Sequence, residues 1–310
     1  MKKFFLCASN NDPHLEQAAQ DLRSSLDRDD VIERSLRKLE QDETDDSVGF
    51  GGFPNLLGVM ELDAAFMDGN SRNCGSVAGV THFLPVRIAR LLMKAQLHTF
   101  LQGAGAEIFA RDCGLEPEPT LSDAQRNKWQ RDIEPLLKNR GAKTHMDIVR
   151  QIAFPQGQNL DTSIMIAGDG KGMSGAATTA GWPYKHPGRV GDAPIIGAGL
   201  YVDSRFGGSC STYTGEMSTR TGMARFVVTQ MSLGKSPREA VHAAIEDVSR
   251  LRGGLLQALV VHATDPSGLE YVAAINAENP VFYQYWHEDL AKPERRKAEA
   301  VSISFPQARI

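Results

Sequence analysis

The chain has 310 residues, and 38 acidic side chains against 34 Lys and Arg give it a formal net charge of −4. A weak negative charge without a dense basic face excludes nucleic acid as a partner, because such binding needs a basic excess that displaces counterions. With 41% hydrophobic and 23% charged residues, the composition is that of an ordinary folded protein and excludes wholesale disorder.

The first apolar stretch, residues 4–8, is shorter than the core of a signal peptide and predicts a buried strand. No apolar run approaches the roughly 18–20 residues that a membrane helix needs, so we expect no membrane association. The four cysteines are far apart and have no CxxC spacing, which predicts neither a disulfide nor a zinc site. These features together favour a cytoplasmic protein.

In the first half of the chain, apolar residues at helical spacing predict two amphipathic helices over residues 15–26 and 31–39. A hairpin follows, with strands at 62–67 and 77–83 joined by a turn at 68–71. Residues 85–111 predict one long helix with a break near two glycines. The charged stretch from about 116 to 159, which opens with two prolines, predicts a polar connector.

The second half restarts with a predicted hairpin, whose strands lie at 162–167 and 172–179. Helical periodicity returns at 217–231 and 240–251, before three strand candidates at 256–263, 270–276 and 281–286. Strands cluster with strands and helices with helices, which indicates the α+β class. We expect two antiparallel sheets packed face to face with helix pairs outside.

Motifs of several common enzymes are missing. Two short Gly-x-Gly fragments, at 168–170 and 197–199, do not open a helix and do not make a dinucleotide fingerprint. The sequence has no phosphate-binding GKS or GKT loop, no GxSxG elbow and no histidine pair at i, i+4. We therefore expect no metal and no cofactor.

The glycine-dense stretch from Asp161 to Glu216 differs from the rest of the chain. It places threonines, an Arg and an Asp at strand ends and tight loops, where a rigid sheet scaffold commonly carries a site. For any single residue the plainer interpretation remains open, since glycines serve turns and threonines suit strands.

Three stretches carry a resemblance to a known family: residues 46–52, residues 62–69, and above all the run Gly-Arg-Val-Gly-Asp-Ala-Pro-Ile-Ile-Gly-Ala-Gly at 188–199. The sequence resembles glycosylasparaginase, also called aspartylglucosaminidase, an N-terminal nucleophile hydrolase. The resemblance extends from Val31 to about Ala274. It implies a four-layer αββα sandwich formed by a single domain over residues 1–310.

The resemblance also implies that the chain cuts itself between Asp161 and Thr162, through an acyl shift onto the threonine hydroxyl. Residues 1–161 and 162–310 would then form two subunits. A threonine hydroxyl needs an adjacent base, and the new α-amine of Thr162, with a reference pKa of about 7.7–8.0, can supply it. The polar connector before the cleavage site can be a flexible segment that moves away after cleavage, or an ordinary surface loop.

Family substrates carry an α-amino and an α-carboxylate group beside the amide that is hydrolysed. By resemblance, Arg189 binds the carboxylate and Asp192 binds the ammonium group, in keeping with the planar fork of arginine and the negative charge of aspartate. The spacing alone fits a surface ion pair as well. The resemblance further implies supporting and oxyanion-binding roles for four residues: Thr179, Thr212, the backbone amide of Tyr213, and Ser47.

Three positions depart from the family pattern. Tyr213 stands where the family usually has glycine, and Leu160 stands where it has histidine. The tryptophan that normally follows the first strand is replaced by the Ser-Asn-Asn sequence at residues 9–11. These departures indicate that the substrate preference and the rate of self-cleavage differ from those of the family.

The leading hypothesis is an amidohydrolase that acts on N4-(β-N-acetylglucosaminyl)-L-asparagine, a small-molecule substrate, as a homodimer of processed units. A close alternative is a β-aspartyl peptidase or L-asparaginase that uses the same Thr162. A third, motivated by Leu160 and Tyr213, is an unprocessed protein that binds an amino-acid-like ligand without turnover.

Overall fold

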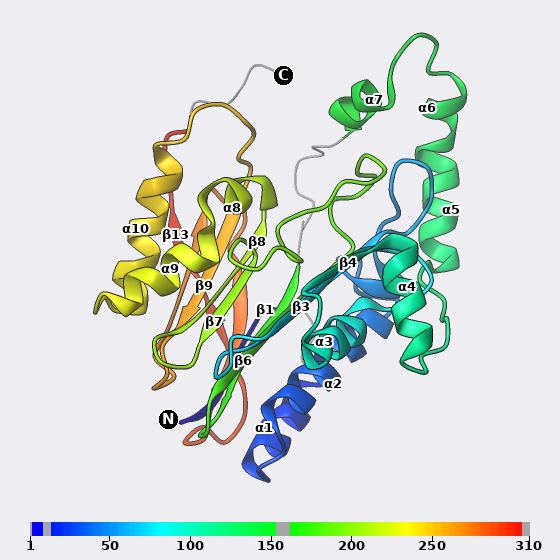
Figure 1. The fold of residues 1–310 in the computed structure, drawn as a ribbon. Helices are drawn as coiled ribbons and strands as arrows, with labels where there is room; N and C mark the ends of the chain where they lie inside the picture. Colours follow the sequence, from blue (N-terminus) through cyan, green and yellow to red (C-terminus); the bar gives the residue numbers. More distant parts are fainter. Residues whose placement is uncertain (1, 9–13, 153–161, 306–310) are drawn as a thin grey trace.

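The computed structural model describes residues 2–8, 14–152 and 162–305. Within these ranges, strands form one sheet of eight strands and one of five (Figure 1). The first has the order β12-β11-β1-β5-β6-β2-β3-β4, with β12 Glu294–Lys297, β11 Phe282–His287, β1 Lys3–Ala8, β5 Ser163–Asp169, β6 Met173–Thr179, β2 Leu62–Asp68, β3 Cys74–Val80 and β4 Phe100–Gln102. The second has the order β13-β10-β9-β8-β7, with β13 Glu299–Val301, β10 Glu270–Ile275, β9 Leu259–Thr264, β8 Gly207–Tyr213 and β7 Leu200–Asp203.

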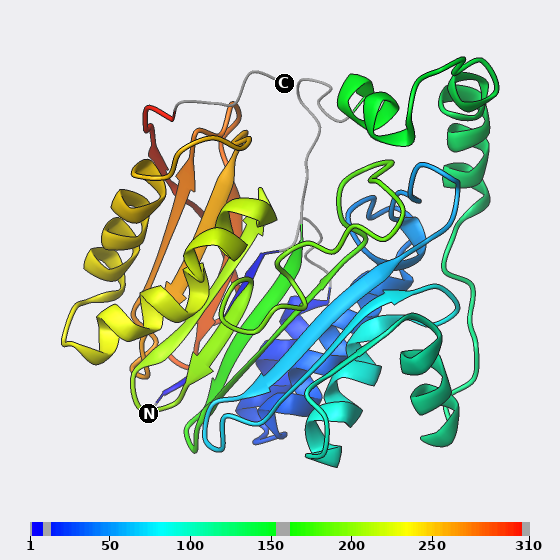
Figure 2. The ribbon, with the colours of Figure 1, turned by 45° about the horizontal axis from the view of Figure 1, so that its top comes forward.

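The helices lie on two sides of the pair of sheets. Figures 1 and 2 show α1 to α4 on one side of the first sheet, and α9 and α10 beside the second sheet. The described helices are α1 Leu15–Arg23, α2 Arg28–Gln41, α3 Pro85–Ala95, α4 Gly103–Asp112, α5 Asp123–Asp132, α6 Glu134–Lys138, α7 His145–Ile152, α8 Gly215–Thr221, α9 Met223–Ser232 and α10 Pro237–Ser249, with a short 3-10 turn at Gly49–Gly51. None of these helices combines the length and the apolar character that crossing a membrane would require.

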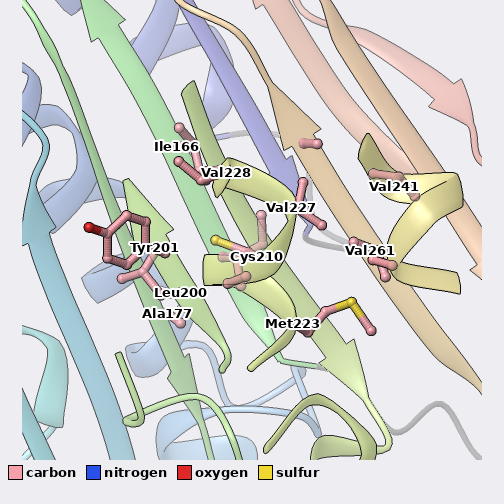
Figure 3. Packing of buried hydrophobic residues seen from close by; sticks show 14 of the residues in the cluster. Ile166, Ala177, Leu200, Tyr201, Cys210, Met223, Val227, Val228, Val241 and Val261 are labelled. Carbon is pink, nitrogen blue, oxygen red and sulfur yellow. The ribbon is translucent and has the colours of Figure 1, made fainter. Parts of the chain in front are cut away.

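Small residues let the two sheets approach each other. A Cβ added at Gly175 of β6 would lie 2.9 Å from the side chains of both Leu200 and Val202 on β7, so glycine is required for this spacing. Figure 3 shows Ile166 and Ala177 of the first sheet in the same cluster as Leu200 and Cys210 of the second. The same cluster continues into α9 and α10, and a second one joins the first sheet to α1–α4.

Local sequence signals explain why several elements begin and end where they do. The hydroxyl of Ser236 accepts a hydrogen bond from the Glu239 amide, and the Glu239 carboxylate accepts one from the Ser236 amide, which makes a capping box before α10. Pro237 occupies the first turn, where its missing N–H costs nothing. Asp27 caps α2 in a similar way, with its side chain accepting from the Asp29 amide.

The expectation of an α+β fold with two sheets and helices is confirmed, and so are the first strand, the helix pair after it and both hairpins. The expectation of purely antiparallel sheets was wrong, because β4 pairs with β3 in parallel and β13 pairs with β10 in parallel. The first parallel pair follows from its connection, since α3 crosses between β3 and β4.

Four further expectations need correction. The single long helix at 85–111 is divided into α3 and α4, because Gln96 adopts a left-handed conformation that ends α3 and β4 follows. The polar connector contains α5, α6 and α7, whose apolar side chains pack on Leu56 and Phe53. The helix at 217–231 is two helices that meet at Gly222, which has a φ of 58°. Strands β7 and β8, in the glycine-dense stretch, were not anticipated as strands.

A buried carboxyl group makes the stability of this fold dependent on pH. Glu40 of α2 is fully buried, and its Oε1 accepts hydrogen bonds from the Thr178 hydroxyl (2.6 Å) and the Val86 amide (3.0 Å). Burial raises the pKa of Glu40 to about 8. The folded protein holds this proton more tightly than the unfolded chain does. The contribution of the protonated Glu40 to the unfolding free energy is therefore complete below about pH 4.5 and is lost as pH rises toward 8.

We expect Glu40→Gln to remove this dependence, since the amide is neutral at every pH and keeps the Oε1 acceptor. As pH rises from 5 to 8, the unfolding free energy of the parent should fall by roughly 3–5 kcal/mol relative to that of the variant. Thermal unfolding at several pH values measures the difference, with the exposed Glu246→Gln of α10 as control. Parallel curves for parent and Glu40→Gln would show that Glu40 is not protonated in the fold.

Candidate active site

The ends of β5, β6 and β8 and the loop after β6 meet at a small pocket. Its lining residues are Thr162, Thr179, Gly181, Trp182, Arg189, Gly191, Asp192 and Tyr213. The cavity has a volume of about 10 Å³, roughly enough for one water molecule. A larger hollow of about 400 Å³ lies over α1 and α2, but mainly polar and charged side chains line it and no threonine is among its lining residues.

The β5–β6 hairpin places two threonines side by side. Thr162 directly precedes β5 and is 7% exposed, whereas Thr179 ends β6. Ser163 pairs with Thr178 in the hairpin register, so the two threonines are brought opposite each other. The Thr162 hydroxyl donates to the Thr179 hydroxyl at 3.4 Å, and the Gly181 amide donates to Thr179 at 2.9 Å. Thr179 therefore contacts the Thr162 hydroxyl.

Arg189 brings a positive charge to the same pocket. Its guanidinium stacks on the ring of Trp182, with 4.6 Å between the Cζ atom and the ring centroid. The side chain is 15% exposed and forms an ion pair with Glu216 at 2.9 Å. The guanidinium is thus held between Trp182 and Glu216 at the wall of the pocket.

Asp192 brings a buried negative charge. Its carboxylate accepts a hydrogen bond from the Ser211 hydroxyl at 2.7 Å. Burial raises the pKa of Asp192 above its ordinary value, while the Ser211 hydrogen bond and the charge of Arg189 oppose the rise. A Cβ at Gly215 would lie 2.4 Å from Oδ1, so only glycine fits beside this carboxylate. An Arg and an Asp in one pocket suit a ligand that carries both charges.

Thr212 faces the first sheet from β8. A Cβ at Gly208 would lie 3.1 Å from Ile166 of β5, and Thr212, four residues later on the same strand, shares that face. Thr212 is buried, and its hydroxyl has no hydrogen-bond partner within the described residues. The hydroxyl is therefore unsatisfied there, although Thr212 is not among the residues that line the pocket.

Tyr213 follows Thr212 with an unusual backbone. Its φ is +80°, a region that favours glycine and costs about 1–3 kcal/mol for other residues. The Tyr213 carbonyl accepts a hydrogen bond from the Trp182 indole at 3.4 Å. A tyrosine here adopts a backbone conformation that glycine adopts more readily.

Ser47 lies near this site but does not line the pocket. Its hydroxyl donates to Asp45, and its carbonyl accepts from the amide of Ala180, the residue after Thr179. Asp161, Leu160 and residues 9–11 lie outside the described residues.

Two side chains at or beside the pocket were not singled out from the sequence. Trp182 lines it, so an indole is present although the tryptophan expected after the first strand is not. Glu216 pairs with Arg189. The sequence signal for Glu216 was its position, three residues after Tyr213 in the glycine-dense stretch. Trp182 has no signal beyond its place between the second hairpin and Arg189.

The fold and the pocket define a class: a two-sheet α+β protein whose small pocket brings together two threonines, an arginine and an aspartate. Comparison with known proteins then identifies the family, since residues 11–285 match the asparaginase family. The chain belongs to the asparaginase family, and the resemblance seen in the sequence is confirmed.

Three relatives illustrate the range of names within the family. The chain is 39% identical over 224 residues to an N(4)-(β-N-acetylglucosaminyl)-L-asparaginase of Elizabethkingia miricola, which covers 72% of this chain and 62% of that protein. It is 32% identical to an isoaspartyl peptidase/L-asparaginase of Mus musculus, covering 76% of this chain and 69% of the relative. It is 33% identical to a plant-type L-asparaginase of Pyrococcus abyssi, covering 70% of each chain. The chain thus spans about three fifths of the bacterial relative and just over two thirds of the other two.

Proposed function

We propose that this protein is a self-processing amidohydrolase that cleaves the side-chain amide of N4-(β-N-acetylglucosaminyl)-L-asparagine or a related β-aspartyl amide. The observation that carries the proposal is the meeting of Thr162, Thr179, Arg189 and Asp192 in one pocket. The 39% identity to a bacterial protein named for this activity supports the glycosylated substrate.

Self-cleavage prepares the nucleophile. The Thr162 hydroxyl attacks the carbonyl carbon of Asp161, the peptide C–N bond breaks as an ester forms, and water hydrolyses the ester. Residue 161 then ends in a carboxylate, and Thr162 gains an α-amine. That amine has a reference pKa of about 7.7–8.0 and can accept a proton near neutral pH. The placement of Thr162 immediately before β5 supports this role.

In turnover, the Thr162 amine accepts the proton of the Thr162 hydroxyl as the oxygen attacks the substrate amide carbon. Thr212 and the Tyr213 amide donate to the resulting oxyanion, and donors of this kind contribute several kcal/mol. The intermediate collapses, the nitrogen leaving group takes the proton, and an ester of Thr162 remains. Water hydrolyses that ester and releases aspartate. Thr179 supports the nucleophile, and Ser47 acts near its amine.

Arg189 and Asp192 bind the two charged groups of the substrate. The guanidinium of Arg189 attracts the α-carboxylate, and the carboxylate of Asp192 attracts the α-ammonium group. Both side chains line the pocket beside Thr162, which supports the assignment.

The proposal extends to the assembly. Residues 1–161 and 162–310 become two subunits of one domain, the two sheets with their flanking helices make a four-layer αββα sandwich, and processed units pair as a homodimer in the cytoplasm without a cofactor. The contacts of α1–α4 with the first sheet and of α9 and α10 with the second support the layered arrangement.

Assays with three substrates test the function: the glycosylated asparagine, a β-aspartyl dipeptide and L-asparagine. We expect the highest kcat/KM on the glycosylated compound. A preference for the dipeptide or for asparagine would favour the alternative that the mouse and Pyrococcus abyssi relatives support by their names. An intact chain that binds aspartate without hydrolysing any of the three would instead establish a ligand-binding protein.

Tyr213 is expected to set the preference for the leaving group. Tyr213→Gly keeps the backbone donor, relieves the strain of a φ of +80° and removes the bulk of the ring. The variant should retain turnover. The ratio of its kcat/KM on the glycosylated asparagine to its kcat/KM on L-asparagine should rise at least about fivefold, because the glycosylamine is the larger leaving group. Equal ratios in parent and variant would show that the ring faces away from the leaving group.

A further inference from the structure

Arg189 makes an interaction that its proposed role in binding substrate does not use. Its Nε and Nη2 donate to Oε1 of Glu216 at 3.0 and 2.9 Å, and Nη2 also lies 3.1 Å from Oε2. A fork that donates through two nitrogens to one carboxylate is among the strongest geometries for this pair. The Glu216 side chain is 41% exposed and Arg189 15%, so the carboxylate lies on the solvent side of the guanidinium.

The third guanidinium nitrogen, Nη1, faces the pocket. A Cβ added at Gly191 would lie 2.9 Å from Nη1, and one at Gly181 would lie 3.2 Å from it. Both glycines line the pocket with Thr162. Within the described residues Nη1 makes no hydrogen bond to protein. One edge of Arg189 is therefore held by Glu216 while the remaining nitrogen is directed toward the place of a ligand.

Glu216 itself is held in position by the junction between β8 and α8. The amide and hydroxyl of Thr214 both donate to the Ala258 carbonyl, at 3.0 and 2.5 Å. The next residue, Gly215, packs directly on Asp192. One short segment thus connects the oxyanion donors, the proposed ammonium site and the partner of Arg189.

We propose that Glu216 is a positioning residue for recognition of the substrate's α-carboxylate, because it fixes the rotation of the Arg189 fork so that Nη1 faces the pocket. This inference rests on the proposed function. The contact with the Trp182 ring holds the guanidinium against the wall of the pocket but does not set the direction of its N–H groups. The Glu216 pair sets that direction, so less entropy is lost when a carboxylate binds.

The opposite role would give the opposite result. If the Glu216 carboxylate occupied the site that the substrate needs, removing its charge would make ligands bind more tightly. A positioning role makes them bind more weakly, so the sign of the change separates the two.

The test uses processed enzyme and L-aspartate, the product that carries the same α-carboxylate. Calorimetric titration should show a Kd about tenfold higher for Glu216→Gln than for the parent. With an amide substrate, KM should rise by a similar factor while kcat changes little. Glu246→Gln, which removes an exposed ion pair with Arg250 on α10, should leave both constants unchanged.

A double-mutant cycle tests whether Glu216 acts through Arg189. In an Arg189→Lys background, Glu216→Gln should raise the Kd by less than about twofold, since the fork is already absent. A full tenfold effect in that background would overturn the inference. Thermal unfolding accompanies each titration. If Glu216→Gln does not fold, Glu216→Asp, whose reach is one methylene shorter, should still raise the Kd severalfold.

The two proposals fail separately. An unchanged or lower Kd in Glu216→Gln or Glu216→Asp, with an active parent, would overturn the inference and leave the function standing. A parent that neither cuts itself nor binds L-aspartate would overturn both.

Discussion

Thr162→Ala is expected to remain a single chain and to lose amidase activity by at least about a thousandfold, because the proposed mechanism assigns self-cleavage and amide hydrolysis to the same hydroxyl. The structure places this hydroxyl 3.4 Å from that of Thr179 in a site with space for about one water molecule. A water molecule from solvent is not fixed in the same way and cannot replace it. Electrophoresis and an assay with the glycosylated asparagine measure the two losses.

Two variants control this prediction. Thr162→Ser keeps a hydroxyl and should still cut itself and turn over substrate, although at altered rates. Thr229→Ala removes an exposed threonine from α9 and should behave as the parent does. Efficient turnover by an intact Thr162→Ala chain would show that another residue is the nucleophile.

Arg189→Lys is expected to lower kcat/KM on an α-carboxylate substrate by about a hundredfold while self-cleavage stays largely intact. Lysine keeps the positive charge but loses the planar fork, its stacking on Trp182 and its paired donation to Glu216. The cut between residues 161 and 162 needs no α-carboxylate, so it should not depend on the fork.

The matched control for this change is Arg250→Lys, which alters an exposed arginine on the surface next to α10. Processing is followed by electrophoresis before each kinetic measurement. Unchanged kinetics in Arg189→Lys would remove Arg189 from carboxylate recognition, and with it the basis of the role given to Glu216.

The elements that the sequence predicted correctly have a strong pattern of their own. The stripe formed by Val31, Ile32, Leu36 and Leu39 fits one face of α2, and all four side chains are buried. The turn after residue 168 marks the second hairpin. In these segments local pattern and tertiary packing agree, so the sequence was sufficient.

The elements that were missed depend on packing between distant segments. Strand β8 begins Gly-Gly-Ser-Cys-Ser, which has little intrinsic strand preference, and it is a strand because β7 and β9 pair with it on either side. Strand β4 has three residues and exists through its pairing with β3. Helix α5 of the expected connector is polar and has no buried residue, so hydrophobic periodicity could not reveal it. Ser122 at its N-cap was the available signal.

The candidate site was predicted mainly through the family resemblance. It named Thr162, Thr179, Arg189, Asp192 and Tyr213, which the structure brings together in one pocket. Their sequence separation is too large for spacing alone to show that they meet. Which partner Arg189 has, and that Trp182 stacks on it, depends on how the loop after β6 folds over β8, and no local pattern encodes that contact.

The central claim is that Thr162 becomes the first residue of a new chain. Intact-mass measurement with N-terminal sequencing of freshly purified protein tests it most directly. The account predicts two chains, with the second beginning at Thr162. A single uncut chain that hydrolyses the amide, or a second chain that begins at any other residue, would contradict it.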